Sequence, residues 1–175
     1  MSETARLGSV GMDVNETATP APPFEDFFEQ ERDSLYRALW LVTRDRFEAE
    51  ELTQEAFVRV LERWERISTM ENPRAYLFQT AMNAFRTSYG RAVLAVKRTM
   101  NAPPADDSIW EVDERDAAVR ALASLSPRQR ASVVLTDMLG FGSDEAAHML
   151  GIRASTLRVH LSRAHAALKE TMSDV

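Results

Sequence analysis

One spacing near the C-terminal end of the chain constrains the fold most. The segment "SDEAAHMLGIRASTLRVHLSRA" (143–164) places the small residue Ala147 four positions before Gly151, and the aliphatic Leu157 six positions after that glycine. A small residue lets two helices cross closely, glycine accepts the left-handed backbone of a tight turn, and an aliphatic side chain anchors the second helix. The spacing therefore predicts a helix-turn-helix unit. An ordinary helical hairpin with a solvated basic face remains an alternative.

The sequence around this unit predicts where its helices begin. Ser126 and Gln129 in "LSPRQR" form a Ser-x-x-Gln capping box, and Pro127 suits the first turn of a helix. Gly142 then breaks the chain, and Ser143 is predicted to cap the next helix. After the turn, apolar residues recur at helical spacing and predict an inner face. They are Leu157, Leu161, Ala164 and Leu168.

Composition divides the chain into four parts. A Pro- and Thr-rich tail (1–23) is predicted to be disordered, and a segment with two prolines and an acidic run (99–112) is predicted to be a flexible linker. The remaining parts, 24–98 and 113–175, show helical periodicity and no alternating strand pattern. The predicted fold class is therefore all-α, with two small helical domains joined by the linker and the helix-turn-helix unit in the second.

The first domain contains an amphipathic segment, "FEAEELTQEAFVRVLERW" (47–64). One side predicts a buried seam. Its members are Leu52, Ala56, Val60 and Trp64. Another side is charged, and it is either a solvated face of i,i+4 ion pairs or a docking surface for basic groups. The charged residues are Glu48, Glu51, Glu55, Arg59 and Glu62.

A further helix is predicted to begin at Asn72, because asparagine is a good N-cap and Pro73 suits the first helical position. The apolar spacing predicts its inner face, which consists of Tyr76, Leu77, Ala81 and Phe85. Polar residues then remain for solvent or a ligand. They are Arg74, Gln79, Asn83 and Arg86.

The charge distribution points to a polyanion. The chain has a net charge of −6, yet residues 72–105 and 151–169 contain no acidic residue and several arginines. Acidic residues outnumber basic ones in 25–71. Two basic patches on an acidic chain favour one polyanion contacted at two places, with the acidic part facing another partner.

Several classes of function find little support. The chain has no cysteine and three histidines, so it offers no thiolate ligand, no disulfide and few metal ligands. Neither a Gly-rich phosphate loop nor a Ser/His/Asp arrangement stands out. No signal peptide or run of apolar residues predicts secretion or membrane insertion. We therefore expect a cytoplasmic protein that is not an enzyme and that has no metal and no cofactor.

Over residues 24–169 the chain resembles extracytoplasmic-function sigma factors, the compact two-domain class of bacterial RNA polymerase specificity subunits. Two motifs carry the resemblance: "AEELTQEAFVRVLERW" (49–64), and "LSPRQR" followed by "GSDEAAHMLGIRASTLRVHLSRAHAAL" (142–168). The resemblance implies a subunit that binds core polymerase through the largest-subunit clamp helices and the flap. It also implies promoter recognition and transcription initiation, at stress- or signal-responsive genes, and control by an anti-sigma factor.

The resemblance assigns the acidic segment to polymerase binding. The implied contact residues are Glu50, Glu51, Leu52, Gln54, Glu55 and Phe57. In the helix that starts after Asn72, it assigns residues to the melted non-template strand of the minus-ten element. They are Arg74, Tyr76, Asn83, Arg86 and Arg91. Tyr76 and Tyr89 are possible stacking platforms for unpaired bases, although aromatic residues at helical spacing more often lie in the core.

In the second domain, the resemblance assigns the outer face of the last helix to duplex DNA of the minus-thirty-five element. The residues are Arg153, Ser155, Thr156, Arg158, His160 and Arg163. The type of base contact stays open, because an arginine can read guanine or simply meet phosphate. His148 and His165 are expected to be helix-surface residues.

A response-regulator-type transcription factor is the alternative, because "TLRVHLSRAHAAL" (156–168) also resembles the output domain of that class. Such a protein would bind DNA without stable attachment to polymerase. It would carry an α/β receiver in front of the helix-turn-helix domain. The helical periodicity of 24–98 argues against a receiver.

Overall fold

The computed structural model describes residues 22–98 and 117–173, and within these ranges every regular element is a helix. The all-α prediction is therefore confirmed for the described residues. The predicted tail up to residue 21 and the predicted linker (99–112) lie outside them. The elements are α1 (Phe24–Thr43), α2 (Arg46–Leu61), α3 (Trp64–Ile67), α4 (Pro73–Arg98), α5 (Ala117–Ala123), α6 (Pro127–Val133), the π-helix η1 (Val134–Met138), α7 (Ser143–Leu150) and α8 (Ala154–Ser173).

Three of the helix starts follow from side-chain caps. Asn72 Oδ1 accepts a hydrogen bond from the Ala75 N–H at 2.9 Å, and Ser126 and Gln129 form the expected capping box. Asp45, which the sequence analysis did not identify, caps α2 by accepting from the Glu48 N–H at 3.0 Å. The predicted cap at Ser143 is wrong. The helix begins one residue earlier than expected, with Ser143 as its first residue. Gly142 is therefore the N-cap, and it has no side chain to form a capping hydrogen bond.

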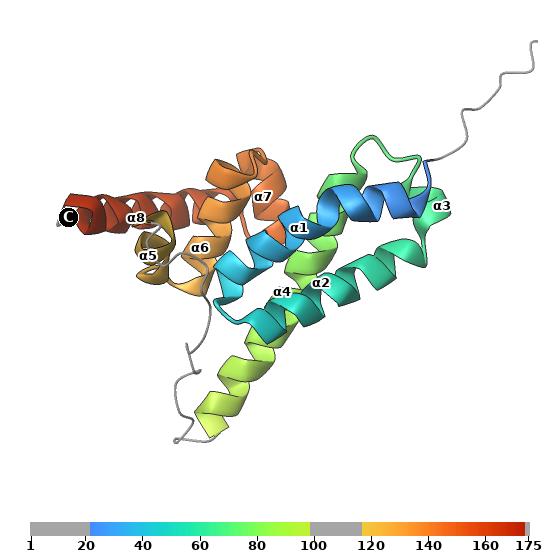
Figure 1. The fold of residues 1–175 in the computed structure, drawn as a ribbon. Helices are drawn as coiled ribbons and strands as arrows, with labels where there is room; N and C mark the ends of the chain where they lie inside the picture. Colours follow the sequence, from blue (N-terminus) through green and yellow to red (C-terminus); the bar gives the residue numbers. More distant parts are fainter. Residues whose placement is uncertain (1–21, 99–116, 174–175) are drawn as a thin grey trace, which may run out of the picture.

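The first domain packs α1, α2 and α4 around one core (Figure 1). At one end an aromatic cluster joins α1 to α2 and α3. The ring centroids of Phe28 and Phe57 lie 4.8 Å apart, and those of Phe27 and Trp64 lie 4.9 Å apart. The Trp64 Nε1–H also donates to the Pro22 carbonyl at 3.0 Å. Aromatic pairs of this kind stabilise beyond the apolar area that they bury, so this end of the domain is tightly fixed.

The second domain contains the helix-turn-helix unit that the sequence predicts. Gly151 ends α7 in the left-handed conformation, with φ of 60°, and the Ile152 N–H donates to the Ala147 carbonyl at 3.0 Å. Ala147 and Leu157 are both buried. The three positions therefore play the roles that their spacing indicates: close helix crossing, tight turn and aliphatic anchor.

The helix that begins after the Ser126 capping box is not uniform along its length. After Val133 the backbone widens into η1, where the Leu139 N–H donates to the Val134 carbonyl at 3.0 Å. The wider turn is followed by Phe141, whose N–H donates to the Leu135 carbonyl at 3.0 Å and whose side chain is buried. Single π-turns of this kind occur often at functional positions.

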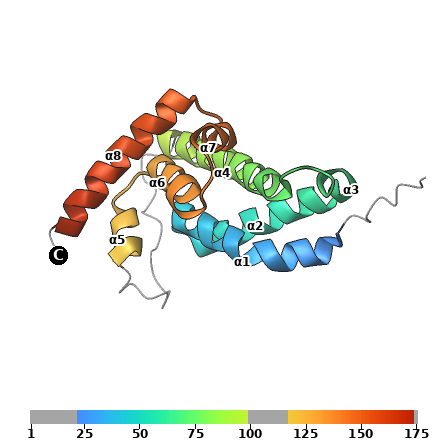
Figure 2. The same cartoon turned by 90° about the horizontal axis from the view of Figure 1, so that it is seen from above.

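The two domains pack against each other. Helix α4 lies beside α7, and α1 lies beside α6 and η1, as Figures 1 and 2 show from two directions. The contact includes the rings of Phe78 and Phe141, 5.3 Å apart. A buried arginine, Arg130, donates from Nε to the Val42 carbonyl at 3.1 Å. The sequence predicts two domains and a tether but not this shared interface.

Candidate nucleic-acid interface

Helix α2 separates a buried face from an exposed acidic face. Glu50, Glu51, Gln54 and Glu55 are all exposed, and Glu55 pairs with Arg59 one turn later. A surface pair at i,i+4 contributes only a few tenths of a kcal/mol. The carboxylates of this face are therefore available to a partner at little cost in stability.

Two residues that the resemblance assigns to polymerase contact do not lie on this face. Leu52 is 3% exposed and Phe57 is 4% exposed, and both belong to the core of the first domain. Leu52 follows the buried seam with Ala56, whereas Phe57 packs on Phe28 in the aromatic cluster. The structure therefore assigns both side chains to packing within the first domain.

The exposed face of α2 also carries apolar residues that the sequence analysis missed. Phe47 is 77% exposed, Val58 is 54% exposed and Leu61 is 52% exposed. Helical spacing was the available signal, because residues 47, 51, 54, 58 and 61 follow one side of the helix. The face is thus apolar at both ends and acidic in between.

Helix α4 presents a polar face toward the second domain. Asn83, Arg86 and Arg91 are exposed. The Arg86 Nη1–H donates to Asn83 Oδ1 at 3.1 Å, and the Arg91 Nε–H donates to the Thr87 carbonyl at 3.4 Å. These bonds fix the side chains along the helix while their outward surfaces stay accessible, as a phosphate or base contact requires.

The other two residues of the predicted minus-ten set, Arg74 and Tyr76, already contact side chains of the protein itself. The Arg74 Nε–H donates to a carboxylate oxygen of Glu31 at 3.1 Å. The Arg74 guanidinium also lies 5.2 Å from the ring centroid of Phe78 and 5.4 Å from that of Phe141. Tyr76 is half-buried, and its hydroxyl accepts from Arg66 Nη2 at 3.4 Å. The structure therefore uses Arg74 in the domain contact and leaves Tyr76 only partly exposed.

Five exposed residues of the predicted minus-thirty-five set lie on α8 or, for Arg153, directly before it. They are Arg153, Ser155, Thr156, Arg158 and Arg163. The sixth, His160, is half-buried, and burial lowers the pKa of its imidazole below the ordinary 6.5, with further lowering by the charges of Arg128 and Arg163. The imidazole is therefore disposed to remain neutral at neutral pH.

The other two histidines are exposed, as expected, and each has a side-chain partner. His148 Nε2 lies 2.8 Å from the Gln79 amide nitrogen, across the domain contact, and His165 Nε2 lies 2.6 Å from Asp137 Oδ2. Within residues 22–98 and 117–173 no group of three or more His, Cys, Asp or Glu side chains could hold a metal ion.

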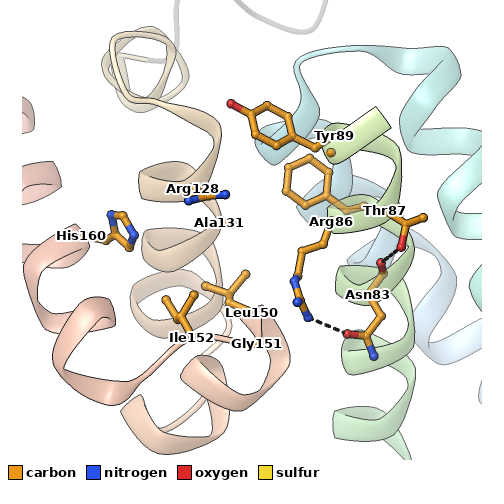
Figure 3. A pocket seen from close by; sticks show the side chains of 12 residues that line it. Asn83, Arg86, Thr87, Tyr89, Arg128, Ala131, Leu150, Gly151, Ile152 and His160 are labelled. Atoms are coloured by element: carbon orange, nitrogen blue, oxygen red, sulfur yellow. Dashed lines mark hydrogen bonds between the residues drawn. The ribbon is translucent and has the colours of Figure 1, made fainter. Parts of the chain in front are cut away.

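A cavity of about 540 Å³ lies between the polar face of α4 and the second domain (Figure 3). Asn83, Arg86 and Tyr89 line one wall, and Arg128 and His160 line the other. Tyr89 stacks on Phe85 with centroids 5.9 Å apart. Residues that the resemblance assigns to the minus-ten element and to the minus-thirty-five element thus meet at one cavity.

Two sequence families match the two domains. Sigma-70 region 2 matches residues 27–106, and sigma-70 region 4 matches residues 115–168. The chain belongs to the sigma-70 family. Helices α2 and α4 of this sigma factor accordingly lie in region 2, and its helix-turn-helix unit lies in region 4.

Named relatives show which sigma factors this chain is similar to. The RNA polymerase sigma-E factor of Streptomyces coelicolor is 33% identical over 152 residues, which cover 85% of each chain. The ECF RNA polymerase sigma factor SigE of Mycolicibacterium smegmatis is 27% identical and covers 95% of this chain and 68% of that protein. The resemblance to extracytoplasmic-function sigma factors is confirmed. The sigma factor therefore binds core RNA polymerase and directs promoter recognition and transcription initiation, as its family does.

Solved structures share the fold. The sigma factor RpoE of Bartonella quintana, in complex with the anti-sigma factor NepR, is 22% identical, with a TM-score of 0.68 over 86% of this chain and 96% of that one. CnrH in complex with the cytosolic domain of CnrY is 21% identical, with a TM-score of 0.56 over 86% of this chain and 88% of that one. The response-regulator alternative is wrong, because the described part of region 2 is helical and no α/β receiver precedes the helix-turn-helix unit there.

Proposed function

We propose that this sigma factor docks on core RNA polymerase through the exposed face of α2. The observation that supports this most strongly is the composition of that face, which is acidic at Glu51 and Glu55 and apolar at Phe47 and Val58. Exposed apolar side chains beside charges are typical of protein interfaces, where the apolar groups supply affinity and the charges supply orientation. Leu52 and Phe57 act from the core by holding the helix in place.

The two DNA contacts follow from the two basic surfaces. Asn83, Arg86 and Arg91 of α4 bind the melted non-template strand of the minus-ten element, with Tyr89 as the stacking surface. The outer face of α8, including Arg158 and Arg163, binds duplex DNA of the minus-thirty-five element. Single strands need stacking surfaces and duplex grooves admit a helix, so the two helices suit these two forms of DNA.

The remaining properties follow from this role. Sigma factors regulate polymerase and leave the chemistry to it, so this chain has no catalytic activity and needs no cofactor. It works in the cytoplasm, where bacterial polymerase acts. The solved structures of similar fold include a sigma factor bound to the anti-sigma factor NepR, and CnrH bound to the cytosolic domain of CnrY. A protein of the anti-sigma class is accordingly proposed as a partner here.

A charge reversal on α2 tests the docking surface. Glu51→Arg places a cation among carboxylates that face the polymerase, whereas Glu65→Arg makes the same change at an exposed position of α3, outside the proposed surface. We expect Glu51→Arg to weaken binding to core polymerase by at least about tenfold, equivalent to about 1.4 kcal/mol, and Glu65→Arg to leave it unchanged. Fluorescence anisotropy of labelled sigma factor titrated with core polymerase measures both affinities. Equal binding by the two variants, with unchanged melting temperatures, contradicts the assignment of this face.

A further inference from the structure

One apolar side chain lies in the middle of the polar outer face of α8. Val159 is 47% exposed, and among the described side chains of α8 no other large apolar one is as exposed. It follows the buried Leu157 by two residues, which turns it about 200° away from that side chain around the helix axis. Figure 2 shows α5, α6 and α7 together on one side of α8. Val159 therefore lies on the opposite side, which faces away from them.

The neighbours of Val159 on this face are small hydroxyl side chains and arginines. Ser155 and Ser162 lie about one turn before and after it, and both are exposed. Arg158 and Arg163 are also exposed and lie on its two sides around the helix axis, and no acidic residue lies between them. On a helix in the major groove, basic side chains at the flanks meet phosphates, whereas the middle of the face meets base edges. Val159 has that middle position.

Helix stability does not account for a valine at this place. A β-branched side chain has a lower helix propensity than alanine or leucine, and an exposed one buries no apolar surface in compensation. In a helix, however, valine has one strongly preferred rotamer, which holds its two methyl groups in fixed positions. A ligand that contacts these methyl groups therefore loses little binding free energy to ordering the side chain. Val159 thus suits recognition better than it suits the stability of α8.

The chemistry of valine restricts which base it can read, because its side chain has no hydrogen-bonding atom. In the major groove, adenine, guanine and cytosine present polar groups at their edges, whereas thymine also presents its C5-methyl group. A polar base edge that is covered by valine loses its water without gaining a partner, and this costs free energy. The methyl group of thymine gains free energy on removal from water.

We propose that Val159 is a specificity-determining residue that packs against the C5-methyl group of one thymine in the minus-thirty-five element. It thereby selects thymine at that position and disfavours the other three bases. The proposal rests on the proposed function of the outer face of α8, and it adds which chemical group of the DNA this face reads. The arginines beside Val159 supply affinity for the duplex, and Val159 supplies discrimination.

Replacing thymine by deoxyuridine tests this contact, because deoxyuridine lacks the methyl group and keeps every hydrogen-bonding atom. The parent holoenzyme first selects a promoter from random-sequence DNA, and each thymine of its minus-thirty-five element is then replaced singly. We expect one of these replacements to weaken binding by the parent holoenzyme about fourfold, the effect of one buried methyl group. We expect the Val159→Ala holoenzyme to bind the thymine and deoxyuridine forms of that promoter equally. Competition binding of the two forms measures the ratio directly.

Met138→Ala is the matched control. It also shortens an exposed apolar side chain of region 4, but on η1 and outside the outer face of α8. The Met138→Ala holoenzyme should keep the preference of the parent for thymine over deoxyuridine. Each holoenzyme is compared with itself on two DNAs, so a change in stability or in affinity for polymerase cancels from the ratio.

The outcomes distinguish this proposal from the proposed function. A minus-thirty-five element without thymine on either strand, equal binding of every deoxyuridine form by the parent, or an unchanged thymine preference in Val159→Ala overturns the role of Val159. Weaker binding of Val159→Ala to core polymerase, with its thymine preference intact, shows a protein contact instead and also overturns it. If the holoenzyme selects no minus-thirty-five element, the proposed function of α8 is contradicted and this proposal with it.

Discussion

Replacing Gly151 by alanine tests the helix-turn-helix turn and the domain contact together. Gly151 has φ of 60°, a left-handed conformation that costs a residue with a Cβ roughly 1–2 kcal/mol. The added Cβ would also overlap the guanidinium of Arg86. The overlap involves the mobile end of a long side chain, so Arg86 moves away and gives up its 3.1 Å hydrogen bond to Asn83. An exposed bond of this kind contributes about 0.5–1 kcal/mol.

The two contributions predict a loss of about 1.5–3 kcal/mol in the free energy of unfolding, which lowers the melting temperature by about 3–12 °C for a protein of this size. In an Arg86→Ala background the second contribution is absent, so Gly151→Ala should cost only about 1–2 kcal/mol there. Thermal unfolding followed by circular dichroism at 222 nm measures all four members of this cycle.

Gly90→Ala is the matched control. Gly90 lies inside α4, and a Cβ there meets nothing within 4 Å, so alanine should raise the free energy of unfolding by about 0.5–1 kcal/mol. If Gly151→Ala lowers the free energy of unfolding no more than Gly90→Ala does, the left-handed turn at Gly151 is contradicted. If Gly151→Ala costs the same with and without the Arg86 side chain, the reasoning about the domain contact is refuted, whereas the turn remains supported.

Three further predictions concern single side chains. Arg158→Ala should weaken binding to the promoter duplex, and if Arg158 contacts one phosphate it should also reduce the slope of log affinity against log salt concentration by about 0.9. Arg32→Ala, at an exposed position of α1, should change neither the affinity nor the slope. Fluorescence anisotropy at several salt concentrations distinguishes the two variants. Ser126→Ala removes the capping box of α6 and should lower the free energy of unfolding by about 1 kcal/mol in urea titrations, and an unchanged midpoint contradicts the capping role. In the folded protein, burial and two arginines lower the pKa of His160. As the pH falls, the unfolded chain therefore binds the proton first. The stability that depends on the neutral imidazole is complete above about pH 6.5 and declines below it. His160→Gln should therefore lose less stability between pH 7.5 and pH 5.5 than the parent protein does, and parallel losses contradict the assignment.

The sequence predicts best what depends on short spacings. Ala147, Gly151 and Leu157 lie within eleven positions of one another, and the geometry of one helix crossing fixes what each must do. The caps at Asn72 and Ser126 are equally local, because the side chain bonds a backbone N–H three residues later. These predictions need no knowledge of the rest of the chain, and the structure confirms them.

Predictions that require knowing which face is covered are less secure. Leu52 and Phe57 were assigned to polymerase contact, but α1 and the aromatic cluster cover them. Apolar residues usually lie inside a protein, yet Phe47 is 77% exposed. Burial depends on partners distant in sequence, and periodicity identifies a face without saying what lies opposite it. The packing of Phe78 on Phe141 has the same origin, because it joins residues of two domains.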